Sequence, residues 1–252
     1  MSARRIVSLA PSVTEILFAL GLNERIVGVT EICDYPPEAR RKPKVGDYQI
    51  SPEKVVALKP DLVVAHEVLN VRVIPVLKRL GLRLLSANPN QFSKLYTFIQ
   101  TIGRATGTES AAERIVRAMQ ARVERVRRRA LPRKPNTLFL ISTEPLWASG
   151  RDTLVDEMIT LAGGRNLFAP AFSNYKAVSL EAVIGGAPEL ILLAGPEPQA
   201  ILDNPRWQRT PAVKRRHVYA LNPDLVLRET PRSVEGLEQI AQKMRLVAQR
   251  QS

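Results

Sequence analysis

The sequence has little of what catalytic and metal sites are usually made from. Its 252 residues include one cysteine, Cys33, and two histidines, His66 and His217. A lone cysteine excludes an internal disulfide, and two histidines exclude a three-histidine metal site. The chain also lacks the Gly-x-Ser-x-Gly, Gly-x-x-x-x-Gly-Lys-Ser/Thr and Gly-x-Gly-x-x-Gly motifs. We therefore expect a protein that is not an enzyme and holds neither a metal nor a cofactor of its own.

Long hydrophobic runs are missing too. No stretch of about eighteen apolar residues occurs, so no membrane-spanning helix is expected. The apolar stretch after Arg4 and Arg5 is interrupted by Pro11, Ser12 and Glu15, which is not typical of a signal peptide. These observations leave both an extracytoplasmic and a cytoplasmic location open.

Acidic residues are few relative to basic ones, 24 against 37, and the formal net charge is +13. Such an excess raises the question of a nucleic-acid partner. The basic residues cluster at Arg125–Arg133 and at Lys214–His217, but no aromatic residues are interleaved with them. No nucleic-acid-binding motif is present either, so we expect a solvated basic surface and no nucleic-acid partner.

Two distant segments of the chain repeat one pattern. Residues 51–64 align with residues 179–192 without a gap. Each copy contains a helix-capping serine, a first-turn glutamate, a proline that ends the helix, and a run of aliphatic residues typical of a buried parallel strand. These positions are Ser51, Glu53 and Pro60 in the first copy and Ser179, Glu181 and Pro188 in the second. A repeat at so long a period predicts two similar lobes rather than a solenoid. From the pattern alone, the two glutamates are equally well explained as carboxylates that favour a helix start.

The start of each lobe also shows a shared order of strand, loop, helix and glycine. In the first lobe we predict a strand over Arg4–Leu9 and a capping box formed by Ser12 and Glu15, with Gly21 ending the helix. The matching elements of the second lobe are a strand over Thr137–Ser142, a helix start at Thr153 and a stop at Gly163. Alternation of strands and helices predicts parallel sheets flanked by helices.

One long helical pattern separates the lobes. Thr106 or Thr108 can cap it, apolar residues recur every three or four positions, and Pro132 ends it. We predict an α/β protein of two Rossmann-like lobes with parallel sheets, joined by a single long backbone helix. The expected boundaries are 1–105 for the N-terminal lobe, 106–131 for the linking helix and 132–252 for the C-terminal lobe. A single stiff helix should restrict hinge opening.

Aromatic residues make up only 5% of the chain, and their positions are informative. Tyr48 and Tyr175 each precede a capped helix, in segments expected to be loops, and Trp147 falls in a predicted loop over Ser142–Arg151. His66 follows a predicted strand, where ligands bind in open parallel sheets. Aromatic side chains at strand ends can line a cleft for a flat ligand, although they also serve as anchors to the core. A single histidine at a strand end is more often structural than a ligand-binding residue.

Four segments of the chain resemble one family. They are Arg5–Glu15, Asp34–Pro37, Leu58–Val63 and Thr230–Arg232, and the likeness extends along nearly the whole chain. The segments resemble those of the class III substrate-binding proteins of ABC importers, the receptors for cobalamin, haem and iron–siderophores. Asp34-Tyr35-Pro36-Pro37 is closest to the cobalamin receptors. The resemblance implies two Rossmann-like lobes joined by one helix, in agreement with the patterns above.

The resemblance also implies roles for individual residues. Glu53 and Glu181 match the glutamates, one per lobe, that dock onto arginines of the dimeric permease. Tyr48, Trp147 and Tyr175 match aromatic positions that line the corrin cleft in the cobalamin receptors. His66 replaces a tryptophan of that cleft and Ile32 replaces a tyrosine, so the two positions depart from the cobalamin pattern. A histidine there could approach a metal centre.

We therefore expect a monomeric substrate-binding protein that binds a metal-containing tetrapyrrole between its lobes. Cobalamin is the first candidate for this ligand. The protein would deliver this ligand to an ABC importer and contact the membrane only through the permease. Its location would be periplasmic or extracytoplasmic. One alternative is a receptor for an iron–siderophore or for haem. A second, of another class, is a cytosolic corrinoid-handling protein or enzyme.

Overall fold

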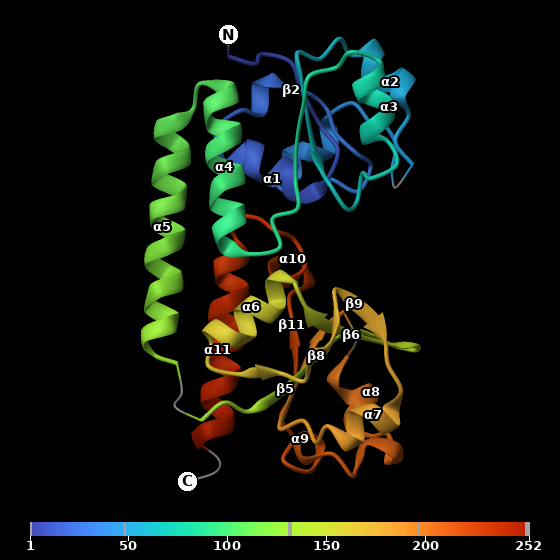
Figure 1. Cartoon of the computed structure of the whole chain (residues 1–252), viewed down its shortest axis with the longest axis vertical. Helices are drawn as coiled ribbons and strands as arrows, with labels where there is room; N and C mark the ends of the chain where they lie inside the picture. The colour runs from blue at the N-terminus through green and yellow to red at the C-terminus, as the bar shows by residue number, and fades with distance from the viewer. Residues whose placement is uncertain (1, 48, 131–132, 196, 250–252) are drawn as a thin grey trace. The chain divides into compact units, whose positions relative to one another are not determined.

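The computed structural model describes residues 2–47, 49–130, 133–195 and 197–249, which form two compact units (Figure 1). Unit 1 comprises Met1–Pro89 and Ser93–Ala118, and unit 2 comprises Asn90–Phe92 and Met119–Ser252. The prediction of a two-lobed α/β protein is confirmed. The division between the units falls inside the long helix, between Ala118 and Met119, rather than at either end of it.

Unit 1 is built on a four-stranded parallel sheet in the order β2-β1-β3-β4. Its strands are β1 (Ile6–Ser8), β2 (Ile26–Gly28), β3 (Leu62–His66) and β4 (Leu84–Ala87). Its helices are α1 (Pro11–Ala19), α2 (Pro52–Ala57), α3 (Ile74–Arg79), α4 (Phe92–Thr106) and the first part of α5 (Glu109–Arg128). Every residue of β3 is buried, as expected of a central strand with both faces covered by helices. The sheet follows the alternation of strands and helices that the sequence predicts.

The core of unit 1 forms where apolar residues of β1 and β3 meet those of the surrounding helices. Val7 and Val63 are fully buried and pack with Val55 of α2 and Leu77 of α3. Burying an aliphatic side chain of this size contributes roughly 1.5–3 kcal/mol relative to leaving it exposed. This core fixes α2 and α3 against the sheet and so positions the loops at the strand ends.

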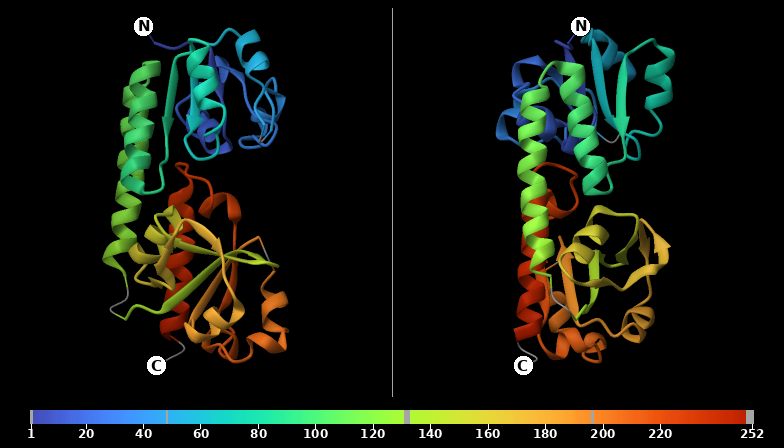
Figure 2. Two further views of the ribbon diagram at one scale, coloured as in Figure 1. Left: turned by 45° about the vertical axis from the view of Figure 1, so that its right-hand side comes forward. Right: turned by 60° about the vertical axis from the view of Figure 1, so that its left-hand side comes forward.

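Unit 2 contains a seven-stranded sheet in the order β11-β10-β5-β6-β8, with β7 beside β5 and β9 beside β6. Its strands are β5 (Asn136–Thr143), β6 (Leu146–Arg151), β7 (Arg165–Asn166), β8 (Phe168–Ser173), β9 (Tyr175–Ala177), β10 (Leu190–Ala194) and β11 (Val218–Leu221). Its helices are α6 (Leu154–Leu161), α7 (Leu180–Gly185), α8 (Pro198–Leu202), α9 (Pro211–Lys214), α10 (Pro223–Val226) and α11 (Ser233–Gln249). Helix α11 packs against α6 and against the β10–β11 side of the sheet (Figure 2).

The sheet of unit 2 is parallel at β5, β7, β10 and β11 but mixed beyond β5. Strand β6 pairs antiparallel with β5, and β9 pairs antiparallel with β6. The prediction of a loop over Ser142–Arg151 was therefore wrong. Only Glu144 and Pro145 separate the two strands, and so short a connection returns the chain alongside β5 as a hairpin.

The repeated segments adopt the predicted structure in both units. Ser51 Oγ accepts the Lys54 N–H at 3.2 Å at the start of α2, and Ser179 Oγ accepts the Ala182 N–H at 3.1 Å at the start of α7. Lys59 and Ala187, at matching positions ahead of the prolines, both have positive φ, 46° and 45°. Such a conformation is uncommon for residues other than glycine. The equivalence of the two segments thus extends to the backbone dihedral angles.

Helix α1 differs from the prediction at its start. It begins at Pro11 with Ala10 as the N-cap, and no side chain caps it. Ser12 lies inside the helix, because proline at the first helical position places the start one residue earlier. The capping box of Ser12 and Glu15 was therefore wrong, whereas the Thr153 cap of α6 is confirmed, with Oγ1 accepting the Asp156 N–H at 3.1 Å.

Helices α4 and α5 form an antiparallel pair (Figures 1 and 2). Helix α4 was not predicted, and it packs against the first part of α5, the long helix that the sequence predicts. The pair is closely packed, because a Cβ atom added at Gly103 of α4 would lie 2.7 Å from that of Ala112 in α5. Helix α5 has the predicted apolar face, with Ala112, Val116, Met119 and Val126 buried. Its predicted end at Pro132 lies outside the described residues.

Candidate functional site

The two glutamates predicted to dock onto a permease lie at corresponding places in the two units. Glu53 is in the first turn of α2 and Glu181 in the first turn of α7, and both side chains are exposed. Each helix is short, six residues, and each is anchored by a buried valine, Val55 or Val183. The capping serines fix where the helices begin, and so fix the position of each glutamate.

A local hydrogen bond favours the charged form of Glu53, and both carboxylates are available to a partner. Ser51 Oγ donates to Glu53 Oε2 at 2.7 Å, and this hydrogen bond lowers the pKa of Glu53. Glu181 has Arg206 as a distant partner, 3.9 Å away, with both side chains largely exposed. Exposed pairs of this length contribute little to stability. Both glutamates can therefore change partner at small cost.

His66, predicted to touch the ligand, is the last residue of β3 and is only 4% exposed. Its Nδ1 accepts the backbone N–H groups of Val68 and Leu69 at 3.3 and 3.4 Å. Asn70 completes the turn, because its Oδ1 accepts the His66 N–H and its Nδ2 donates to the Leu9 carbonyl. The imidazole thus organises the loop after β3, which agrees with the structural role that the sequence left open.

Ile32, another predicted site residue, lies on the segment after β2. Ile32 is half-buried and stands next to Cys33, whose Sγ is within hydrogen-bonding distance of the hydroxyls of Thr14 and Thr30. Tyr35 follows shortly after and is 41% exposed. Tyr48 lies outside the described residues. The Asp-Tyr-Pro-Pro motif thus presents an aromatic ring to solvent at the carboxyl end of the sheet.

The structure brings Trp147 and Tyr175 together in unit 2. Trp147 of β6 pairs with Ala177 of β9, and Ser149 of β6 pairs with Tyr175. Residues paired in an antiparallel ladder share a face, as do residues two apart on one strand, so both rings lie on the same face as diagonal neighbours. Trp147 is 39% exposed. Both residues were expected in loops, and their location in strands holds them more rigidly.

The hydroxyl of Tyr175 is buried although its ring is partly exposed. Burial raises the pKa of Tyr175, the negative charge of Glu229 raises it further, and a hydrogen bond with Thr153 opposes both. Thr153 also bonds to Ser149 at 2.7 Å, so the phenol joins a network at the start of α6. Tyr175 is therefore neutral at any physiological pH.

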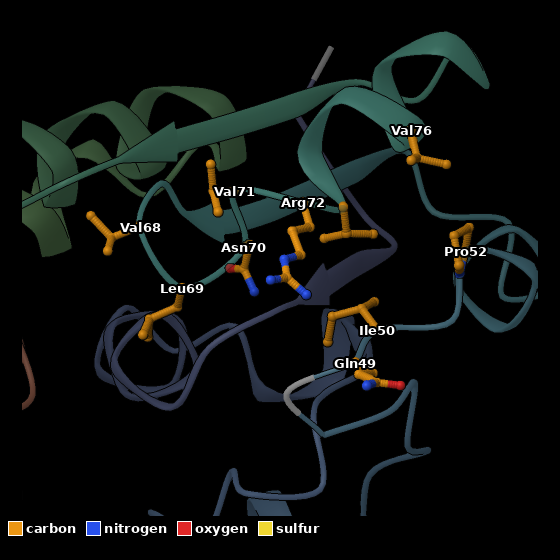
Figure 3. Close-up of a pocket in the computed structure, with 10 residues that line it drawn as sticks. Gln49, Ile50, Pro52, Val68, Leu69, Asn70, Val71, Arg72 and Val76 are labelled. Carbon is orange, nitrogen blue, oxygen red and sulfur yellow. The ribbon is translucent and has the colours of Figure 1, made fainter.

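Three exposed apolar residues near the predicted site were missed in the sequence. Val68, Leu69 and Val71, in the loop after β3, are 59%, 56% and 62% exposed. They line a pocket of about 620 Å³ together with residues that precede or begin α2 (Figure 3). The signal that could have found them is the apolar sequence Val68-Leu69-Asn70-Val71 directly after a buried strand, at the edge where ligands bind.

Metal-ligating side chains do not gather in the described part of the chain, where no group of three histidine, cysteine, aspartate or glutamate residues could hold an ion. Within those residues, too, no helix is long and apolar enough to cross a membrane. The basic clusters are partly neutralised: Glu124 pairs with Arg127 and Arg128, and Glu189 with Arg133. His217 is fully buried and so is not part of a basic surface.

Comparison with known proteins identifies the family. A model of the periplasmic binding proteins matches residues 6–225, and the chain belongs to this family. The chain is 35% identical over 251 residues to an ABC transporter substrate-binding lipoprotein of Bacillus subtilis, covering 96% of this chain and 80% of the relative. It is also 30% identical over 256 residues to the vitamin B12-binding protein of Vibrio cholerae, covering 99% and 91%.

Solved structures agree with this assignment. The periplasmic vitamin B12-binding protein of Vibrio cholerae superposes with a TM-score of 0.88 at 29% identity, covering 98% of both chains. A periplasmic haem-binding protein in complex with two haems gives a TM-score of 0.84 at 25% identity, covering 98% and 99%. The protein is thus a substrate-binding protein of an ABC importer, of the class that serves cobalamin, haem and siderophores. This class is one of solute-binding proteins and not of enzymes.

Proposed function

We propose that the protein captures cobalamin or a closely related corrinoid outside the cytoplasm and delivers it to an ABC permease. The observation that carries this proposal is the 30% identity to a vitamin B12-binding protein over 99% of the chain. The Asp34-Tyr35-Pro36-Pro37 segment, with its exposed tyrosine, also favours a corrinoid.

The proposed ligand site uses residues from both units. Ile32, Tyr48 and His66 would contribute from the first, and Trp147 and Tyr175 from the second. Trp147 and Tyr175 share a strand face, which suits stacking on one flat ring system. His66 would act through the loop that it organises, because its ring is buried and its Nδ1 already accepts two N–H groups.

Haem is the second candidate. The haem-binding relative matches almost as well in structure, with a TM-score of 0.84. The replacements at His66 and Ile32 depart from the cobalamin pattern, and that departure favours keeping haem in the test.

Visible spectroscopy separates the candidates. The purified protein is mixed with cobalamin, haem or a ferric siderophore, desalted and scanned, since each ligand has its own absorption bands. We expect cobalamin to be retained at about one equivalent. Retention of haem alone would identify haem, and not cobalamin, as the ligand. Retention of a siderophore alone would exclude both tetrapyrroles as ligands.

A further inference from the structure

The pocket beside α2 has an unusual composition for a surface hollow. Its described lining is mostly apolar, and the only charged side chain in it is Arg72. In Figure 3 the Arg72 side chain extends from the loop after β3 into the space between Asn70 and Ile50. Within the described residues, Arg72 takes part in no hydrogen bond or ion pair. A guanidinium beside apolar side chains, with no carboxylate in the described lining, is suited to an anion.

The loop that carries Arg72 is held in place before any ligand arrives. Asn70 is 6% exposed, and its side chain bonds to the backbone of both His66 and Leu9. Its carbonyl accepts the N–H groups of Val73 and Ile74 at 3.1 Å, which leads the chain into α3. A preformed loop lowers the entropy lost on binding, so a single charge-assisted contact there is effective.

The apolar side chains indicate what accompanies the anion. Val68, Leu69 and Val71, which precede Arg72 in the loop, expose more than half of their surface. Contiguous exposed apolar residues of this kind mark a binding surface. An ion such as free phosphate would leave them in water, whereas a carboxylate or phosphate attached to an apolar ring system would cover them.

We propose that Arg72 and the loop of Val68–Val73 form a subsite that selects ligands carrying a carboxylate or phosphate group on an apolar body. The proposal rests on the proposed function in taking that body to be a tetrapyrrole. The anion would be the phosphodiester of cobalamin or a propionate of haem, which present the same chemistry to a guanidinium.

Nuclear magnetic resonance with a small probe tests the subsite independently of the tetrapyrrole. The ¹⁵N-labelled protein is titrated with 2-naphthylacetic acid and with its neutral amide. We expect the acid to bind about tenfold to a hundredfold more tightly than the amide. Its shifts should centre on Val68–Val73, and Arg72→Gln should abolish the difference. Arg79→Gln, which changes an exposed arginine of α3 outside the pocket lining, is the matched control and should preserve it.

Two ligand pairs then identify the source of the anion. Cobalamin is compared with cobinamide, which lacks the phosphodiester, and haem with its dimethyl ester. We expect Arg72→Gln to weaken the anionic member of one pair about tenfold or more and to leave its partner unchanged.

Equal binding of acid and amide, or a preference that survives Arg72→Gln, would overturn the subsite. If the probe behaves as expected but no tetrapyrrole binds, the proposed function fails and the subsite stands.

Discussion

At the scale of single residues, the proposed ligand-binding side chains are positioned by their neighbours. Tyr175 is held by the pairing of β9 with β6, and His66 organises a turn through its Nδ1. Trp147 differs from both because it is 39% exposed and no hydrogen bond of its indole is observed among the described residues. Of these three residues, Trp147 is therefore the most accessible to a ligand.

Trp147→Ala should weaken binding of the retained tetrapyrrole about fivefold or more, because a stacked ring contributes roughly 1 kcal/mol beyond area burial. Isothermal titration calorimetry measures the affinity. Trp147→Phe is the control and should recover most of it, and thermal melting should be nearly unchanged for both variants. Wild-type affinity in both Trp147→Ala and Tyr175→Ala would exclude this face from the ligand site.

Glu157 is a half-buried acid whose role is structural. Its Oε2 accepts the Phe92 N–H at 2.6 Å, and burial raises the pKa of its carboxyl, with Asp156 adding to the rise. Because the folded state holds the proton more tightly, this group favours folding most below its unfolded pKa. That contribution is lost as the pH rises through the folded pKa.

Glu157→Gln keeps the acceptor oxygen and removes the charge. Its stability relative to wild type should therefore rise between about pH 4 and pH 7. Glu157→Ala also removes the acceptor and should cost about 1–3 kcal/mol. Urea unfolding at both pH values measures the difference. A Gln variant that loses stability relative to wild type on going to pH 7 would contradict the expected sign.

At the scale of elements, the α4–α5 pair is determined by close packing. Gly103 is buried in α4, and a Cβ atom there would come within 2.7 Å of Ala112. The residues of α5 that face the core recur at helical spacing, so that helix could be predicted. The approach of the two helices could not, because it depends on a contact between residues that no periodic pattern relates.

Gly103→Ala should destabilise the protein by about 1–3 kcal/mol through overpacking, which outweighs the gain of about 1 kcal/mol in helix propensity. Gly185→Ala in α7 is the matched control, because an added Cβ meets nothing within 4 Å there. It should be neutral or slightly stabilising. Chemical denaturation measures both, and a Gly103→Ala protein as stable as wild type would mean that the helices separate easily.

At the scale of the whole molecule, α5 runs without a break through the division between the units. Its second part is held by Arg122, whose guanidinium bonds to both carboxylate oxygens of Glu238 in α11 at 3.0 and 2.7 Å. The chain also enters unit 2 at Asn90–Phe92, before α4 begins. We expect a continuous helix and a second passage of the chain to restrict hinge motion.

Ligand binding should therefore change the radius of gyration very little, unlike binding in receptors with flexible hinges. Small-angle scattering with and without ligand measures the change. A contraction of several ångströms would show that α5 bends or that the connecting segments yield. A ligand-free sample with glycerol added to match the scattering contrast is the control. It shows any change in the radius of gyration that the solution conditions cause by themselves.

Glu53→Ala with Glu181→Ala should abolish transport in a reconstituted importer while leaving melting and ligand affinity close to wild type. Both carboxylates are exposed and contribute little to the fold, but paired arginines on a dimeric permease would meet them. Glu38→Ala with Glu67→Ala removes two other exposed acids as the control. Transport at the wild-type rate by the protein with Glu53→Ala and Glu181→Ala would contradict the docking role. The two glutamates would then serve only to favour the helix starts.

The sequence by itself determined the repeated elements. Ser51 and Ser179 could be recognised as caps, and the aliphatic runs of β3 and β10 as buried strands, because capping and burial depend on residue type and local order. The family resemblance rested on the same segments. It also placed Glu53 and Glu181 on exposed helix starts.

Only the tertiary structure decided which side chains meet. Trp147 and Tyr175 are 28 residues apart in sequence and become neighbours because β6 and β9 pair antiparallel. The burial of His66 and the pocket around Arg72 likewise depend on Asn70 reaching back to Leu9. Local patterns reflect local energies, whereas strand pairing and loop closure depend on contacts between residues distant in the chain.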